Sequence, residues 1–242
     1  MRRRAILATI GVVAATGVAV GYWLMSRNAA GPRDIAVIRA KVQPRLAHAL
    51  SPHGASVGDP MLIRIFKETK ELEVWVRGDR GYRLFRTYPI CAYSGTLGPK
   101  LKEGDGQAPE GFYRVGLSAL NPQSSYHLSF NLGFPNAFDR AHGRSGSFLM
   151  VHGRCVSIGC YAMTDPVIEE IYVMVEATAR ATRSEVPVHI FPFRMTTENM
   201  TRHAGSPWIG FWQTLKPAYD AFEASRQPPR ITVSAGQYVT TR

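Results

Sequence analysis

The stretch Phe148–Asp165, FLMVHGRCVSIGCYAMTD, carries the clearest fold signal in the chain. An apolar run ends at His152, Gly153 permits a sharp exit, and Gly159 and Cys160 lead toward a proline-marked helix start. This order predicts a strand, a tight loop and a helix within a few residues. It brings a histidine and a cysteine close together along the chain.

Cys160 and His152 form a candidate nucleophile and base. A cysteine attacks as its thiolate, and a nearby imidazole makes that thiolate easier to form by accepting the proton. A glycine before the nucleophile lets the backbone approach a substrate carbonyl, so N–H groups near Gly159 could stabilise an oxyanion. We expect Cys160 to be the nucleophile, His152 the proton acceptor and donor, and the Gly159 backbone part of an oxyanion hole.

Spacing alone leaves other interpretations of these residues open. Cys155 and Cys160 with His152 and His142 are metal-ligating types, but their spacing matches no common zinc motif, so we expect no metal. Cys91 could instead pair with Cys155 in a disulfide and leave Cys160 free. A structural histidine beside two buried, unreactive cysteines is a further interpretation. No glycine-rich phosphate loop is found, and we expect no cofactor.

Short β runs dominate the chain before and within this stretch. Residues 72–77 alternate apolar and polar side chains, which predicts a strand with one face more buried than the other. The turn-rich inserts 96–111 and 132–146 are expected to be loops that frame a site. The predicted strands are Met61–Phe66, Leu72–Val76, Tyr82–Tyr88, Phe112–Val115, Tyr126–Phe130, Phe148–His152 and Val186–Phe193.

Helix signals lie on both sides of the β runs. Residues 34–50 predict a helix interrupted near Pro44, and Asp165 is the expected N-cap of a helix with Pro166 at its first position. Residues 206–225 predict a helix kinked near Pro217, and 231–239 a terminal extended segment. The expected fold is mainly β with flanking helices (α+β), with a catalytic domain at 61–193 and a helical extension with a terminal strand at 194–242.

The N-terminus predicts export. Three arginines at positions 2–4 precede an uncharged run over residues 5–25, which is long enough to cross a bilayer as a helix. No convincing A-x-A cleavage site follows it. We therefore expect an uncleaved signal anchor at 1–27 in the cytoplasmic membrane, a linker and helix at 28–60, and the remainder in the periplasm of a bacterial cell envelope.

Charge and cysteine count narrow the possible partners. The net charge is +11, but the first 33 residues carry five arginines and no acid, which leaves 24 basic and 18 acidic residues elsewhere. Without a Lys/Arg run, this surplus does not indicate nucleic acid. The three cysteines lie in an oxidising compartment if the chain is exported, and an odd count leaves at least one unpaired.

Several motifs resemble a known enzyme family. His152-Gly153 followed by Ser157-Ile158-Gly159-Cys160 resembles the signature of the YkuD-type L,D-transpeptidases. APEGFYRV, residues 108–115, resembles the upstream T-P-x-G-x-F strand of that family. The span 61–193, with LGPKLKEGDGQAPEGFY and NLGFPNAFDRAHGRSGSF, is similar to the YafK-like branch.

The resemblance implies a partly closed β-sheet with the cysteine in a cleft, and a cysteine acyl-enzyme formed on diaminopimelate-containing stem peptides of peptidoglycan. It implies that the Gly153 carbonyl orients His152 and that Ser157 supports the loop. The acyl group would pass to an amine, in cross-linking or protein attachment. The alternatives are a hydrolase that releases wall-linked lipoprotein, and a non-catalytic wall-binding module.

Two features depart from the family pattern. Ile158 stands where the common motif has a second histidine, and the interval from His152 to Cys160 is much shorter here. His142 is the candidate to assist in place of that histidine. Arg140 and Arg144, on the same predicted loop, are expected to pair with stem-peptide carboxylates.

Overall fold

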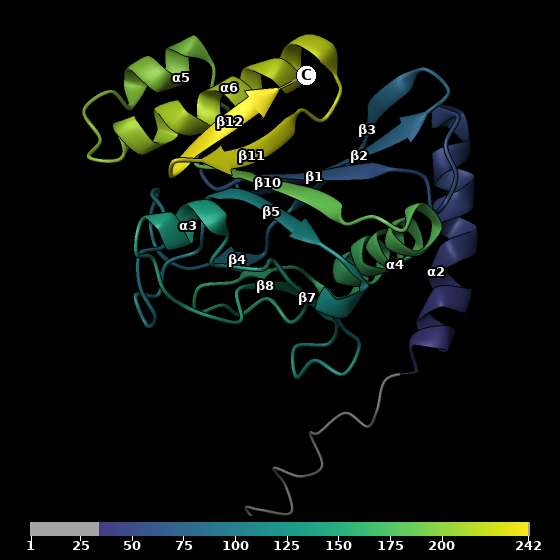
Figure 1. Ribbon diagram of the computed structural model, residues 1–242. Coiled ribbons are helices and arrows are strands. Elements are labelled where there is room, and N and C mark those ends of the chain that lie inside the picture. The colour runs from purple at the N-terminus through teal and green to yellow at the C-terminus, as the bar shows by residue number, and fades with distance from the viewer. Residues whose placement is uncertain (1–33, 242) are drawn as a thin grey trace, which may run out of the picture. The chain divides into compact units, whose positions relative to one another are not determined.

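Two five-stranded sheets organise the chain. The computed structural model describes residues 34–241, so the predicted signal anchor at 1–27 lies outside the described residues. The first sheet has the order β3-β2-β1-β10-β5, and within it only β1 and β10 run parallel (Figure 1). Its strands are β1 Met61–Phe66, β2 Glu71–Gly78, β3 Gly81–Pro89, β5 Gly111–Val115 and β10 Val186–Phe191.

The first sheet is covered on both faces. In β1, Met61, Ile63 and Ile65 join the large core that contains helix α4 (Asp165–Thr182). Leu62 lies on the opposite face, with Phe222 of helix α6 (Ile209–Ser225). Residues 72–76 of β2 are all buried between these two layers, and the face of Leu72, Val74 and Val76 is the more buried one, as predicted.

The second sheet is made of much shorter strands. Its order is β4-β9-β8-β7-β6, and β8 and β9 are its parallel pair. The strands predicted at Tyr126–Phe130 and Phe148–His152 are shortened at their starts, because His127 and Phe148 have φ angles of 71° and 54°, which no strand adopts. The strands are β4 Ala92–Tyr93, β6 Leu120–Asn121, β7 Ser129–Asn131, β8 Met150–His152 and β9 Tyr161–Ala162.

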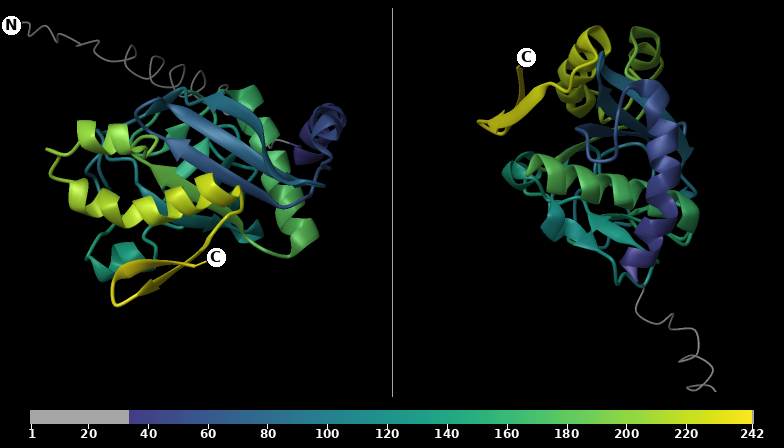
Figure 2. Two further views of the ribbon diagram at one scale, coloured as in Figure 1. Left: turned by 90° about the horizontal axis from the view of Figure 1, so that it is seen from above. Right: turned by 90° about the vertical axis from the view of Figure 1, so that its right-hand side faces the viewer.

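Helices α2 (Ile35–Leu50) and α4 lie side by side at one end of the sheets (Figure 2). Arg39 pairs with Glu176 at 2.6 Å and Lys41 with Glu169 at 2.9 Å across their contact. The predicted interruption of α2 is wrong, because the helix continues through Pro44. Pro44 is exposed, so water can bond the carbonyl that the missing N–H leaves free.

The N-cap of α4 is Thr164, one residue before the predicted Asp165. Short 3-10 turns at Ser51–His53 (η1) and Leu117–Ala119 (η2) connect other elements.

The C-terminal region differs from its prediction in two places. Helix α6 continues through Pro217, and helix α5 (Thr197–Arg202) precedes it. The predicted extended segment at 231–239 is a hairpin of β11 (Arg230–Ser234) and β12 (Gln237–Thr241). It turns at Ala235 and Gly236, which have positive φ angles.

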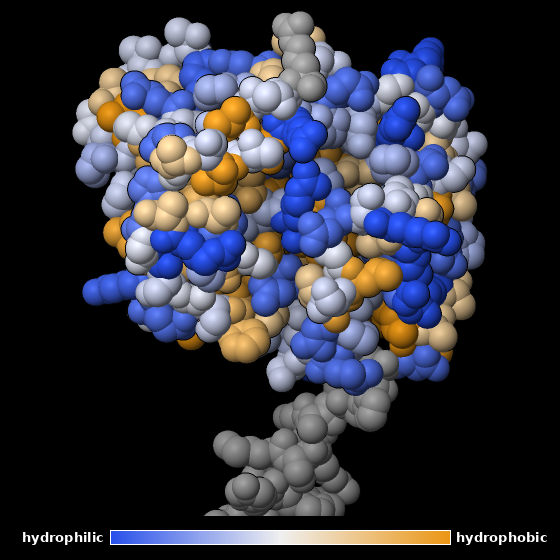
Figure 3. Space-filling view, in the orientation of Figure 1, coloured by the Kyte–Doolittle hydropathy of each residue, from blue (hydrophilic) through white to orange (hydrophobic). Residues whose placement is uncertain are grey.

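The insert 132–146 is also not entirely a loop. It contains helix α3 (Ala137–Ala141), which a capping box between Asn136 and Asp139 starts. On the face shown in Figure 3, polar residues are interspersed with small hydrophobic patches. Over residues 34–241, no helix combines the length and apolar character needed to span a membrane.

Candidate active site

Cys160 and His152 are brought together by the parallel pair of the second sheet. Val151 of β8 lies opposite Tyr161 of β9, and His152 lies opposite Ala162. Because side chains alternate along a strand, Cys160, just before β9, points to the same face of the sheet as His152. Both line one pocket of about 260 Å³, together with residues of the 121–126 segment, Phe148 and Met150.

The immediate surroundings of His152 fix its orientation. Its Nδ1 lies 2.7 Å from the carbonyl oxygen of Gly153. A carbonyl only accepts, so Nδ1 carries the proton and Nε2 keeps a free lone pair. The ring of Tyr126 lies 4.7 Å from the imidazole. With the proton on Nδ1, His152 is in the tautomer that a general base for a thiol requires, because Nε2 can accept the thiol proton.

Only glycine fits at position 153, because the backbone there passes too close to its neighbours for any side chain. A Cβ at Gly153 would lie 2.6 Å from a carboxylate oxygen of Asp165 and 2.9 Å from the carbonyl oxygen of Tyr126. Its N–H donates to the same Tyr126 carbonyl at 2.9 Å. The backbone therefore passes close to two neighbouring segments immediately after His152.

The turn that carries Cys160 is closed by hydroxyl groups. Ser157 Oγ accepts from the N–H of Cys160 at 2.9 Å and donates to its carbonyl at 2.7 Å. The N–H of Gly159 donates to Ser94 Oγ. Gly159 has φ 99°, a conformation that favours glycine. In this state the N–H groups of Gly159 and Cys160 both have partners, so an oxyanion would take the place of a serine hydroxyl.

Both reacting groups are held neutral. Burial raises the pKa of the Cys160 thiol, while the Met150 N–H and the Lys100 ammonium act in the opposite direction. Burial lowers the pKa of His152, opposed by its hydrogen bond to Gly153. The thiol donates weakly to the Phe148 carbonyl at 3.6 Å. Burial therefore favours the neutral thiol and the neutral imidazole over a thiolate–imidazolium pair.

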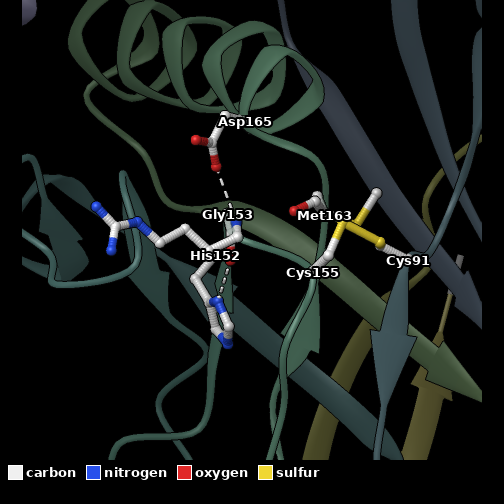
Figure 4. The surroundings of a disulfide bond; sticks show 7 residues. Cys91, His152, Gly153, Cys155, Met163 and Asp165 are labelled. Carbon is white, nitrogen blue, oxygen red and sulfur yellow. Dashed lines mark hydrogen bonds between the residues drawn. A yellow bond between two sulfur atoms is a disulfide. The ribbon is translucent and has the colours of Figure 1, made fainter.

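The two other cysteines form a disulfide at the start of the same loop. Cys91 and Cys155 are bonded, and Cys160 is free. Figure 4 shows the disulfide beside Gly153 and His152, with Met163 close to it. The disulfide takes Cys155 out of the set of zinc ligands considered from the sequence.

The structure places His142, Arg140 and Arg144 apart from this pocket, at helix α3. His142 stacks on Phe138 at 4.1 Å, and its Nδ1 lies 2.9 Å from the Phe138 carbonyl oxygen. Arg140 donates to the carbonyl of Pro135.

Arg144 pairs with buried Asp139 at 2.9 Å and lies over the ring of Phe211. These three side chains do not line the pocket of Cys160 and His152, because the insert forms a capped helix with its own contacts. Their roles in assisting Cys160 and in pairing with carboxylates stay predictions.

Two residues of the site carry no signal in the sequence. Tyr126 lies in a predicted strand that looks like any other, yet its ring covers His152 and its carbonyl holds Gly153. Ser94 follows β4 and reaches Gly159 across the loop, 65 residues away in sequence. The pairing of β4 with β9 brings Ser94 near the nucleophile. A strand of two residues has no recognisable sequence pattern, so this contact could not be predicted.

Comparison with known proteins places this geometry in context. The sequence profile of the YkuD family, described as the L,D-transpeptidase catalytic domain, matches residues 60–224. The YafK protein of Escherichia coli K12, provisionally designated an L,D-transpeptidase, is 50% identical over 186 residues, which cover 77% of this chain and 76% of YafK. Its counterpart in E. coli O157:H7 matches equally.

Two solved structures are also similar to the chain. The helical cell shape determining protein Pgp2 of Campylobacter jejuni is 17% identical with a TM-score of 0.45, over 78% of this chain and 80% of Pgp2. Bd1075 of Bdellovibrio bacteriovorus is 19% identical with a TM-score of 0.42, over 73% of this chain and 77% of Bd1075.

Proposed function

Because the chain belongs to the YkuD family of L,D-transpeptidase catalytic domains, we propose that it is a cysteine acyltransferase acting on diaminopimelate-containing stem peptides of peptidoglycan. Cys160 is the nucleophile and His152 the base and later the acid. The observation that carries the proposal is the neighbouring placement of these two side chains in one pocket. Cys160 is also the one cysteine that the disulfide leaves free.

The acylation step follows from the protonation states. His152 Nε2 takes the proton of the Cys160 thiol as Sγ attacks a carbonyl at the L-centre of diaminopimelate in the donor stem. A bond forms between Sγ and the carbonyl carbon, and the oxygen gains the negative charge. The amide C–N bond then breaks, and the departing amine takes the proton from His152. The product is a thioester on Cys160.

Two groups shape this step without exchanging protons. The Gly153 carbonyl keeps the imidazole in the reactive tautomer and stabilises the imidazolium that forms transiently. Ser157 fixes the turn through its two hydrogen bonds to Cys160. The N–H groups of Gly159 and Cys160 serve the oxyanion once the donor carbonyl displaces their serine partners.

The second half-reaction selects the product. An amine that enters the pocket attacks the thioester, gives its proton to His152 and releases Cys160, which yields a cross-link or an attached protein. Water in the same position yields hydrolysis, and release of a wall-linked lipoprotein is the corresponding alternative activity.

The proposed location is the periplasm, with residues 5–25 as a membrane anchor. The Cys91–Cys155 disulfide supports an oxidising compartment. Digestion of spheroplasts with an externally added protease tests this placement. Loss of the intact chain supports it, and protection of the chain until the membrane is lysed contradicts it.

The activity is tested with purified muropeptides and the exported domain. We expect Cys160→Ala to abolish processing of tetrapeptide-containing muropeptides, as followed by liquid chromatography and mass spectrometry. We expect Ser125→Ala, which changes an exposed residue lining the same pocket, to retain processing within a few-fold. Equal processing by wild type and Cys160→Ala would favour the remaining alternative, a non-catalytic wall-binding module with a contaminating activity.

A further inference from the structure

A groove continues from the Cys160 pocket to the far end of the first sheet. A second pocket, of about 400 Å³, shares Asn121, Phe148 and Met150 with the Cys160 pocket. A third, of about 420 Å³, shares Arg114, Gly133 and Glu185 with the second. We call this third space, between β5, α3 and the β11–β12 hairpin, the distal pocket. Because neighbouring pockets share three lining residues, the three spaces adjoin one another, and we call them together the groove.

A buried histidine without a complete set of partners lines the distal pocket. His189 of β10 is 3% exposed, and its Nδ1 has no hydrogen-bond partner among residues 34–241. Burial, with the charges of Arg64 and Arg114, lowers the pKa of His189 to about 3, so the ring is neutral at physiological pH. An unpaired nitrogen in a buried ring is unusual, and a bound polar group relieves its cost.

The mouth of the distal pocket is basic. Arg114 and Arg140 line it, and both are exposed. Within residues 34–241 neither forms an ion pair, although Arg140 donates to the Pro135 carbonyl. Glu185 is the one acidic residue that lines the second and distal pockets. Two guanidinium groups against one carboxylate favour an anionic ligand, and guanidinium groups bind carboxylates particularly well.

The floor of the groove includes the free edge of a sheet. Strand β5 is the last strand of its sheet and pairs only with β10. Phe112 directs its backbone groups outward, to Tyr238 Oη and Asn136 Nδ2. Arg114, two residues later, has the same orientation by alternation, and its partner on β10 is Pro187, which has no N–H. The Arg114 N–H and C=O therefore point away from β10, toward the edge at which an extended chain would pair.

We propose that the distal pocket binds a carboxylate-bearing peptide, which lies along the edge of β5 at Arg114 while another part of the same ligand occupies the Cys160 pocket. Arg114 and Arg140 bind the carboxylate, and the β5 edge bonds the peptide backbone. The peptide's identity as part of a wall muropeptide rests on the proposed function.

The test measures binding of a muropeptide to the Cys160→Ala protein, which lacks the proposed nucleophile. The probe is a cross-linked muropeptide dimer with two tetrapeptide stems, titrated calorimetrically into the Cys160→Ala protein. We expect Arg114→Gln in that background to raise the Kd about tenfold, and the Arg114→Gln, Arg140→Gln pair to raise it further. The same dimer with its carboxylates converted to amides should bind all these proteins equally.

The matched control is Arg83→Gln. Arg83 is exposed on β3, the opposite edge strand of the same sheet, so its loss changes net charge equally without altering the groove. An equal loss of affinity in Arg83→Gln and Arg114→Gln, or the same Kd for the Arg114→Gln and parent proteins, overturns the proposal. The proposal is also overturned if Arg114→Gln weakens binding of the amidated dimer as much as it weakens binding of the unmodified dimer.

A separate measurement distinguishes this inference from the catalytic proposal. Acylation of Cys160 by a carbapenem, which is too small to reach the distal pocket, should be unchanged in Arg114→Gln with Cys160 intact. A protein that binds the dimer as expected but forms no carbapenem adduct would contradict the catalytic proposal and leave the binding result standing. A slower adduct in Arg114→Gln would assign Arg114 to the Cys160 pocket and overturn the distal assignment.

Discussion

The two sheets of the molecule differ in strand length and in the interactions that stabilise them. The first has strands of five to nine residues, and its central strands β1, β2 and β10 are buried on both faces by α6 and by the α4 layer. The second has strands of two or three residues, linked by loops with positive φ angles and tied by a disulfide. The first sheet is stabilised by apolar packing. The second holds Cys160 and His152 through specific hydrogen bonds and one covalent link.

This difference teaches that stability and reactivity reside in separate parts of the fold. A residue that determines the free energy of unfolding should leave Cys160 chemistry intact, whereas a residue of the second sheet should change that chemistry at a smaller cost in stability.

The largest effect on stability is expected from Phe191→Ala in the first sheet. Phe191 is fully buried and stacks on Phe66 at 5.7 Å, and removal of such a ring leaves a cavity. We expect a loss of about 3–5 kcal/mol in the free energy of unfolding, measured with urea. The rate of Cys160 alkylation below the unfolding transition should change by less than about twofold.

The matched control is Phe148→Ala at the rim of the Cys160 pocket. Phe148 is 71% exposed, so its removal should cost less than about 1 kcal/mol. A large change of Cys160 alkylation in Phe191→Ala would show that the two regions are coupled and would contradict the separation.

The disulfide should affect both properties. The Cys91→Ser, Cys155→Ser double variant loses a link across 64 residues, and we expect it to lose about 2–4 kcal/mol. Its acylation by a carbapenem should slow by about tenfold or more, because small displacements of reacting groups are costly. Reduction of the wild type should reproduce both changes. Unchanged acylation in the double variant would show that Ser157 and Ser94 position the turn without the disulfide.

The smallest and most specific effect concerns pH. Burial raises the pKa of the Cys160 thiol, so its thiolate appears at a higher pH than that of an exposed cysteine. Alkylation by iodoacetamide should therefore rise with a midpoint above that of a cysteine in a peptide, measured in parallel. A midpoint below the peptide value would indicate a resting thiolate–imidazolium pair.

The first sheet could be predicted from sequence because burial determines it. Met61–Phe66 was predicted with its observed bounds, since a continuous apolar run between turns is typical of a strand buried on both faces. The alternation in β2 does not indicate that Glu73 is also buried, which its contacts with Trp75 and Arg194 bring about. Pro44 does not interrupt α2, and Pro217 does not break α6.

The candidate site could be predicted only where it depends on neighbours in sequence. The interval from His152 to Cys160 spans one loop, and its glycines indicate a close turn, so this pair was identified from sequence. Tyr126, Ser94 and the pairing of Cys91 with Cys155 depend on long-range strand order, which local patterns do not encode. Helix α3 within the predicted loop was missed because the capping box between Asn136 and Asp139 was not recognised.

The most direct test of the central claim is the site of carbapenem acylation. The wild-type protein is incubated with a carbapenem, digested with trypsin and analysed by tandem mass spectrometry, beside Cys160→Ala and His152→Ala. The account predicts one adduct, on the peptide that contains Cys160, absent from Cys160→Ala and formed at least about a hundredfold more slowly in His152→Ala. An adduct on any other residue, or equal rates in wild type and His152→Ala, would contradict it.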